Sequence, residues 1–235
     1  MTEISTIPYH ASAVTFDGSA WLQLHAWLTG VGAYNKAIFS CWTKLSNAND
    51  GLWYAAPTGS DFFQQAVTSN AGVKYFNMNI TNGYMDTLPN LPAMESAGWQ
   101  NVLIAVDIST SRIAQIFVNG TDVSTGGTAL SGSDNSVSTG TDFYFADDGF
   151  GARITGDVAD VQMWFNAYLD FSVTANRELF ILGGKPVRPT VASGILGTPS
   201  ILFSGNSSTF PTNQGTGGSF TLHGSLTNAA TSPSD

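Results

Sequence analysis

Residues 98–123 constrain the fold of this chain more than any other stretch. Apolar residues alternate there with a period of two in two runs, 102–106 and 114–118, which predicts two β-strands. The polar run between them is typical of a turn, and Asn119 with Gly120 supplies the positive φ angles of a second, tight turn. Both faces of the first run are apolar, so we expect a central strand covered on both sides. The stretch therefore predicts an antiparallel meander inside a layered β protein.

Four short motifs follow one another along the chain. They are FDGS at 16–19, IFSCW at 38–42, Trp99 ahead of the meander with its VNG turn at 118–120, and GDVADVQMW at 156–164. Their order and spacing resemble those of laminin-G-like domains, which share the concanavalin A-like fold. The resemblance covers the larger part of the chain. It implies an all-β, two-sheet antiparallel jelly-roll sandwich with one short helix and a C-terminal extension.

The composition is that of a folded β-sandwich. Of 235 residues, 43% are hydrophobic and 11% are charged, which is enough apolar material for a two-sheet core and too much for a disordered chain. Cys41 is the only cysteine, so stability has to come from the core rather than from a disulfide framework. The shared period of two predicts these core residues: Trp42, Val102, Ile104, Val106, Ile116, Val118, Val161 and Met163.

One helix is predicted over residues 168–182. Asp170 or Ser172 can cap its N-terminus, and Gly183 with Gly184 can stop it. Laminin-G-like domains often carry a short helical turn at this place, so the resemblance agrees with the helix pattern. We therefore expect one short helix beside the sheets.

The chain is predicted to have two units. Residues 1–184 form the jelly-roll domain with an N-terminal arm, and residues 185–235 form a Pro- and Gly-rich C-terminal extension. Five side chains of the extension are too apolar to remain in water, so we expect it to pack on the domain or on a neighbouring copy. These residues are Ile201, Leu202, Phe203, Phe210 and Phe220.

The charge pattern excludes two classes of partner. The formal net charge is -9 and no run of Lys or Arg is present, so the chain offers no basic patch to nucleic acid. Charged or turn residues interrupt every apolar run well before the length of a membrane span, so we expect no membrane partner. The first residues lack the basic and apolar regions of a secretory signal peptide, and we expect synthesis in a host cytoplasm.

The sequence lacks the catalytic residues of the glycan-cleaving enzymes that use this fold. Glycoside hydrolysis needs a proton donor and a second carboxylate, which related glucanases place on one strand as E-x-D-x-x-E. No glutamate of this chain has an Asp two residues later, and Asp157 and Asp160 are explained by a turn cap at a strand entrance. The three histidines lie far apart, with no nucleophile motif and no metal-ligand spacing. We therefore expect no enzymatic activity.

The resemblance also raises a calcium site. Laminin-G-like domains often bind a calcium ion at a sheet rim through Asp side chains and backbone carbonyls. Asp147 and Asp148 follow an aromatic strand in an acidic turn, where such hard oxygen ligands gather. A solvated β-turn also explains the pair and is preferred, because paired Asp residues are common in turns. We therefore expect no cofactor, with calcium at these two residues as the alternative.

A sugar-binding platform is a further hypothesis for the first half of the chain. Aromatic rings stack on pyranose faces when they point outward, but strand alternation assigns at least half of the candidates to the core. The candidates are Trp53, Tyr54, Phe62 and Tyr75, with Phe63 beside them.

Two functions of different class fit these observations. The glycine-rich ending FPTNQGTGGSF at 210–220 resembles a tail found in laminin-G-like proteins of tailed bacteriophages. With the catalytic residues missing, we expect a non-enzymatic structural or adhesion protein of a virion, such as a capsid decoration, fibre or tail-associated subunit. Its expected partners are other virion proteins, copies of itself and a host-surface glycan. The alternative is a carbohydrate-binding module or glycan-active protein that recognises cell-surface polysaccharide.

Overall fold

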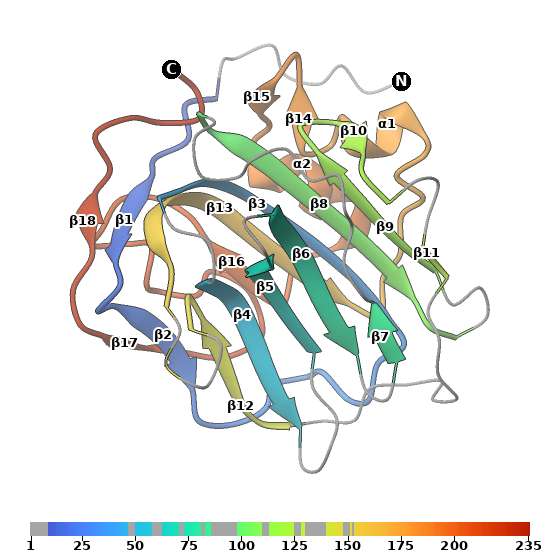
Figure 1. Cartoon of the computed structure of the whole chain (residues 1–235), viewed down its shortest axis with the longest axis horizontal. Helices are drawn as coiled ribbons and strands as arrows, with labels where there is room; N and C mark the ends of the chain where they lie inside the picture. The colour runs from blue at the N-terminus through green and yellow to red at the C-terminus, as the bar shows by residue number, and fades with distance from the viewer. Residues whose placement is uncertain are drawn as a thin grey trace.

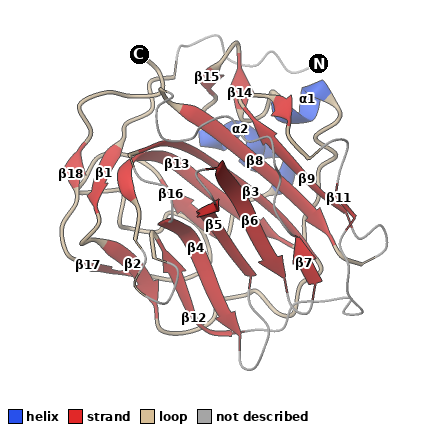
Figure 2. Cartoon of the chain, in the orientation of Figure 1, coloured by secondary structure: helices blue, strands red, loops and turns tan. Residues whose placement is uncertain are grey.

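The protein is an all-β sandwich. The computed structural model describes residues 9–46, 50–57, 63–70, 73–80, 83–85, 98–109, 113–124, 128–129, 140–147, 151 and 153–235. Two antiparallel sheets pack face to face, and Figure 1 shows one of them in front of the other. Strands dominate the described part of the chain, and the helices are short (Figure 2). The predicted two-sheet antiparallel jelly roll is therefore confirmed.

Sheet A has nine strands in the described residues. Its order is β10-β9-β8-β3-β13-β1-β18, with β11 beside β9 and β16 beside β13. The bounds are β1 Val14–Asp17, β3 Lys36–Leu45, β8 Gln100–Asp107, β9 Ile113–Val118, β10 Thr121–Asp122, β11 Thr128–Ala129, β13 Thr155–Phe165, β16 Ile201–Phe203 and β18 Thr227–Asn228.

Sheet B has seven strands in the described residues, in the order β17-β2-β12-β4-β5-β6-β7. The bounds are β2 Trp21–Leu24, β4 Asp50–Pro57, β5 Phe63–Asn70, β6 Val73–Ile80, β7 Gly83–Met85, β12 Gly140–Phe145 and β17 Thr221–His223. A small hairpin joins β14 Ile181–Leu182 to β15 Lys185–Pro186, and the helices are α1 Thr174–Arg177 and α2 Pro189–Leu196.

The central hairpin forms as the alternation predicts. Strand β8 lies between β3 and β9, and Ile104 is directly opposite Ile116. All residues of β8 are buried, which fits a strand covered on both faces. Asn119 and Gly120 have φ angles of 51° and 77°, so they form the predicted tight turn into β10.

Two apolar clusters cover the two faces of sheet A. The main core fills the space between the sheets and includes Phe39, Ile104 and Phe145. The outer cluster contains residues that alternate with those of the main core, such as Trp42, together with side chains from the α1 and α2 region. All eight predicted core residues are at most 3% exposed, so this prediction is confirmed.

The helix predicted over 168–182 is much shorter in the structure. Only Thr174–Arg177 is helical, and Val173 precedes it without a side-chain cap. Gly183 and Gly184 turn the β14–β15 hairpin instead of ending a helix. The apolar residues 179–181 are consecutive, and all three pack under the outer face of sheet A, which a regular helix could not arrange. No helix in the described ranges is long and apolar enough to cross a membrane.

The C-terminal residues contribute to both sheets. Strands β16 and β18 pair with β13 and β1 of sheet A, and β17 pairs with β2 of sheet B. Phe203 and Phe210 are fully buried in the main core. The last residues return to the start of the described chain, where the Ser232 hydroxyl donates to the Ala11 carbonyl at 2.6 Å. Residues at both ends of the described chain therefore find hydrogen-bond partners within the same chain.

Candidate functional site

Sheet B has one face in the main core and one in solvent. On β12, Phe143 and Phe145 are fully buried, whereas Asp142 and Tyr144 are partly exposed. On β2, Gln23 follows the core residue Leu22, so it lies on the solvent face. Strand alternation thus brings polar side chains from two neighbouring strands together on that face.

Four side chains on this face form the Gln23 cluster, which consists of Gln23, His25, Asp142 and Tyr144. The Gln23 amide nitrogen lies 3.1 Å from the Tyr144 hydroxyl and 3.5 Å from Asp142 Oδ1. His25 Nδ1 lies 3.1 Å from the same Asp142 oxygen and 3.1 Å from the Gln23 nitrogen. The side chains of His25 and Asp142 are 69% and 28% exposed. The cluster is therefore fixed by hydrogen bonds and still open to solvent.

Asp142 keeps one carboxylate oxygen open. Its Oδ1 receives the contacts from Gln23 and His25, while no described residue donates to its Oδ2. Ionised carboxylates only accept hydrogen bonds, and the bonds that they accept from hydroxyl groups are stronger than those between neutral partners. The cluster therefore presents an anchored acceptor beside an amide and a phenol.

Trp21 borders the Gln23 cluster and is part of a three-layer stack. The His223 ring lies parallel to it, with 4.4 Å between ring centroids and 6° between planes. The Arg153 guanidinium carbon lies 3.6 Å from the centroid of the Trp21 ring. Two groups this close to the ring centre cannot share one face, so they cover opposite faces of the indole. Trp21 therefore packs between His223 and Arg153 and offers no open ring face to a ligand.

The backbone register aligns one position of every strand of sheet B with Gln23 and Tyr144. One position from each of the seven strands lies in a single cross-strand row, at the strand spacing of about 4.8 Å. In sheet order the row is Thr221, Gln23, Tyr144, Tyr54, Gln64, Asn79 and Tyr84. Every residue in it carries a hydroxyl or an amide.

The two acidic residues proposed for calcium are only partly described. Asp147 is buried, and Arg153 Nε donates to its Oδ2 at 2.8 Å. An arginine therefore occupies one of the two carboxylate oxygens of Asp147, while Asp148 lies outside the described residues. In the described ranges, no group of three or more His, Cys, Asp or Glu side chains is arranged to hold a metal.

Three of the four aromatic candidates for a sugar platform lie on strands of sheet B for which the backbone register alone is described. Trp53 is opposite Phe145, which belongs to the main core, whereas Tyr54 is opposite Tyr144 of the Gln23 cluster. Tyr75 is opposite Thr68 between β5 and β6. Phe62 lies outside the described residues.

The sequence patterns did not single out Gln23, Asp142 or Tyr144, and they gave His25 no catalytic or metal-binding role. The available signal was the alternation of polar with apolar residues on β2 and β12. That alternation identifies an exposed face but not its partners, because the strands come together only through the register of sheet B.

A buried carboxyl group lies on sheet A, at a bulge in β13. Asp160 has a φ of 47°, and the pairing of β13 with β3 shifts register around it. Its Oδ1 accepts from the Tyr9 hydroxyl at 2.9 Å and the Ser204 hydroxyl at 2.7 Å, while Oδ2 has no partner among the described residues. Burial raises the pKa of Asp160 to about 6, and the two hydroxyl donors only partly oppose that rise.

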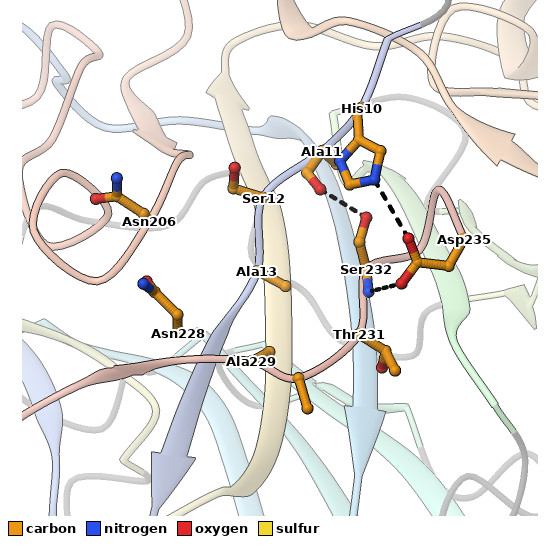
Figure 3. A pocket seen from close by; sticks show the side chains of 11 residues that line it. His10, Ala11, Ser12, Ala13, Asn206, Asn228, Ala229, Thr231, Ser232 and Asp235 are labelled. Carbon is orange, nitrogen blue, oxygen red and sulfur yellow. Dashed lines mark hydrogen bonds and ion pairs between the residues drawn. The ribbon is translucent and has the colours of Figure 1, made fainter.

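A pocket of about 320 Å³ lies where the two ends of the described chain meet (Figure 3). His10 Nε2 lies 3.2 Å from Asp235 Oδ1 at its edge, and Ser232 bonds to both Ala11 and Asp235. These bonds join the ends of the chain to each other. The polar groups they use are engaged within the protein, which favours a structural role for this pocket.

A second pocket, of about 540 Å³, lies at one end of β1, β3 and β13. Asp157 accepts from the Thr15 hydroxyl at 2.6 Å and lies 4.0 Å from Lys44 Nζ. The charges of Lys44 and Asp157 are paired with each other, and Asp17 accepts from Ser19. The open acceptor of the Gln23 cluster therefore makes the solvent face of sheet B the stronger candidate site.

Solved structures share this fold, although no protein-family model and no curated protein matches the sequence. A putative carbohydrate binding protein from Bacteroides ovatus aligns over 96% of this chain and 62% of its own, with a TM-score of 0.65 and 12% identity. A heptameric SAP-like pentraxin from Limulus polyphemus covers 72% of this chain and 82% of its own (TM-score 0.53, 15% identity). Domains LG4-5 of the mouse laminin alpha1 chain cover 72% and 46% (TM-score 0.53, 14% identity).

Identities this low indicate a common fold and no more. The chain also spans less than two thirds of the Bacteroides and laminin proteins that it matches. The agreement nevertheless covers both sheets, since almost the whole chain aligns with the Bacteroides protein. The chain thus has the jelly-roll fold of laminin G-like, pentraxin and concanavalin A-like domains.

Proposed function

We propose that the protein binds carbohydrate on the solvent face of sheet B and that the Gln23 cluster is the centre of this site. The observation that carries the proposal is the Asp142 carboxylate, which is anchored through one oxygen and open at the other. Sugars present adjacent hydroxyl groups, and an anchored carboxylate beside an amide accepts and donates the hydrogen bonds that they need. A structural neighbour described as a putative carbohydrate binding protein supports the same class of ligand.

The proposed activity is binding without chemistry. Glycoside hydrolysis uses two carboxyl groups on opposite sides of the scissile bond. Of the described acids near the cluster, Asp142 is anchored by Gln23 and His25, and Asp147 is buried against Arg153. That arrangement supports recognition better than acid–base catalysis.

A glycan array followed by calorimetry tests the proposal. The wild-type protein is expected to bind at least one polysaccharide, and Gln23→Ala is expected to lose that binding, because it removes the amide that anchors Asp142 and Tyr144. Lys36→Ala is the matched control, since Lys36 pairs with Asp107 on sheet A, away from the cluster. Absence of glycan binding by folded wild-type protein, or equal binding by Gln23→Ala, would reject the proposal.

A place on the virion of a tailed bacteriophage is a second, separate proposal. It rests on the sequence resemblance of residues 210–220, which the structure shows to be an ordered loop around Asn213. In that setting, glycan binding would serve adhesion to a host surface, beside other virion proteins and copies of this chain. Mass spectrometry of purified particles tests it, and particles without the protein would exclude it.

A further inference from the structure

We infer that the sheet B site takes neutral glycans and rejects glycans that carry carboxylate or sulfate groups, with Asp142 as the residue that sets this specificity. The inference rests on the proposed carbohydrate function and narrows it to one chemical class. It follows from the carboxylate at the site and from the contacts that engage the lysine and arginine side chains in the described part of the chain.

The open oxygen of Asp142 distinguishes a hydroxyl group from an anionic group. A sugar hydroxyl has a hydrogen to donate to Oδ2, whereas a carboxylate or sulfate has only acceptor oxygens at neutral pH. An anionic group at hydrogen-bond distance from Oδ2 would bring two like charges together on a partly desolvated surface. The same atom therefore attracts neutral sugars and repels acidic ones.

Arg153 is the one described cation near this face that could compensate such repulsion, and it is already engaged. Its guanidinium covers Trp21 and donates to the buried carboxylate of Asp147. An arginine that binds an acidic sugar would have to give up one of these contacts. Its charge is thus balanced inside the protein and is not available as a free anion receptor.

The other described lysine and arginine side chains serve sheet A and its outer layer. Each has a contact there: Lys36 with Asp107, Lys44 with Asp157, Arg177 with Phe117, Lys185 with Asp235 and Arg188 with Tyr9. Of the eight lysines and arginines in the sequence, only Lys74 and Arg112 lie where side chains are not described.

His25 is the remaining group that could carry positive charge at the cluster. Its Nδ1 faces Asp142 Oδ1 at 3.1 Å, so any charge that it gains lies against the anchored oxygen rather than beside the open one. Its exposed ring edge faces solvent, where opposing charges are strongly screened. His25 therefore helps to orient Asp142 and does not convert the cluster into an anion site.

Matched pairs of polymers that share a backbone test the specificity. Suitable pairs are hydroxyethylcellulose with carboxymethylcellulose, methyl-esterified with de-esterified polygalacturonate, and dextran with dextran sulfate. Full-length protein is measured by affinity electrophoresis and calorimetry at physiological salt, where repulsion from distant charges of the acidic protein is largely screened. We expect binding to at least one neutral member and at least tenfold weaker binding to its acidic partner.

Two variants with the same change in net charge assign the specificity to a residue. Asp142→Asn is expected to weaken the affinity for the neutral polymer roughly tenfold, since a charge-assisted hydrogen bond becomes a neutral one. It is also expected to reduce the ratio between the affinities for the neutral and the acidic polymer of each pair. Glu178→Gln, at the end of α1 beneath sheet A, is expected to change neither value. The inference would be overturned, and carbohydrate binding left intact, if the wild type bound the acidic polymers as tightly as the neutral ones or more tightly. An unchanged ratio between the two affinities in Asp142→Asn would have the same meaning. Failure to bind any polymer would overturn both.

Discussion

Trp21 and His223 stack face to face across neighbouring strands, with ring centroids 4.4 Å apart. The two residues are directly opposite in the register of β2 and β17, so the stack supports the pairing of β17 with β2. Arg153 closes the other face of the indole and links it to buried Asp147. The candidate site is therefore supported at one edge by a part of the chain that the sequence motifs assigned to an extension.

Changing His223 tests how much this stack contributes to stability. His223→Ala removes a parallel ring from Trp21 and is expected to lower the free energy of unfolding by about 1 kcal/mol, the contribution of a stacked aromatic pair. His223→Phe keeps a ring and removes Nε2, a buried nitrogen that has no partner among the described residues, so it should be at least as stable as wild type. Urea denaturation of the three proteins measures both effects. Equal loss in both variants would show that the ring stack is not the stabilising element.

Gly156 marks a close approach between β13 and β3. Its φ is 145°, and a Cβ atom there would lie 2.5 Å from the Lys44 carbonyl oxygen and 2.7 Å from the Leu45 Cα. Gly156→Ala is therefore expected to cost at least about 2 kcal/mol, since both obstacles are backbone atoms that cannot swing aside. Gly194→Ala in α2 is the matched control: no atom would contact its Cβ, and helix propensity predicts a gain of up to about 1 kcal/mol. Thermal unfolding of both variants should shift in opposite directions.

The features that sequence alone could predict are those fixed by local periodicity. The alternation in β8 and β9 places Ile104 and Ile116 in the core whatever the rest of the chain does, and the Asn119–Gly120 turn needs only its own residues. The helix was the failure, because Phe180 and Ile181 are buried side by side by contacts with sheet A that no local pattern records.

The candidate site lay beyond sequence reasoning for a related reason. Gln23 meets Tyr144 only because β2 pairs with β12 in one register, and a shift of one residue would exchange the solvent and core faces. Asp160 was interpreted as a turn cap, yet it lies buried at a bulge and accepts from the hydroxyl groups of Tyr9 and Ser204, which are both far from it in the sequence. Such contacts depend on tertiary structure.

Asp160 predicts a pH dependence of stability. Burial raises its pKa from the ordinary aspartate value of 3.8 to about 6, so the folded protein favours the neutral carboxyl. The stabilisation of that neutral form is complete below about pH 4 and is lost as the pH rises through 6. Asp160→Asn cannot ionise, and Asn tolerates the positive φ, so its stability relative to wild type should rise by roughly 2 to 3 kcal/mol between pH 4 and pH 7.

Melting temperatures of wild type, Asp160→Asn and Glu178→Gln over that pH range check this dependence. Glu178→Gln controls for the loss of one carboxyl group on the surface layer. The melting temperature of Asp160→Asn should rise relative to that of the wild type as the pH increases. A constant difference would mean that the carboxyl is not desolvated in the folded protein.

Ser232 links the last residues to the first described ones through hydrogen bonds. Its hydroxyl donates to the Ala11 carbonyl and accepts from the Ser234 amide at 3.0 Å. Ser232→Ala leaves a buried carbonyl without its donor and is expected to cost about 1 to 2 kcal/mol, a decrease of several degrees in melting temperature. Ser208→Ala, which removes an exposed hydroxyl from a local turn, should leave the melting temperature unchanged. A Ser232→Ala protein that melts like wild type would show that the ends of the chain do not stabilise the sandwich.

Two substitutions of Tyr144 test separately what its hydroxyl group and its aromatic ring contribute to glycan binding. Its hydroxyl contacts the Gln23 amide at 3.1 Å, and its position lies in the cross-strand row between Gln23 and Tyr54. Tyr144→Phe keeps the ring and is expected to weaken binding to the preferred neutral polymer about threefold to tenfold, because the amide loses one partner that holds it in place. Tyr144→Ala also removes the ring and should weaken binding by a further factor of about ten, since aromatic surface packs on the apolar face of a sugar ring. Both variants keep the buried residues Phe143 and Phe145, so melting temperatures within a few degrees of wild type would exclude unfolding as the cause. Affinities that stay equal across the three proteins would remove Tyr144 from the site and move the bound glycan away from the Gln23 cluster.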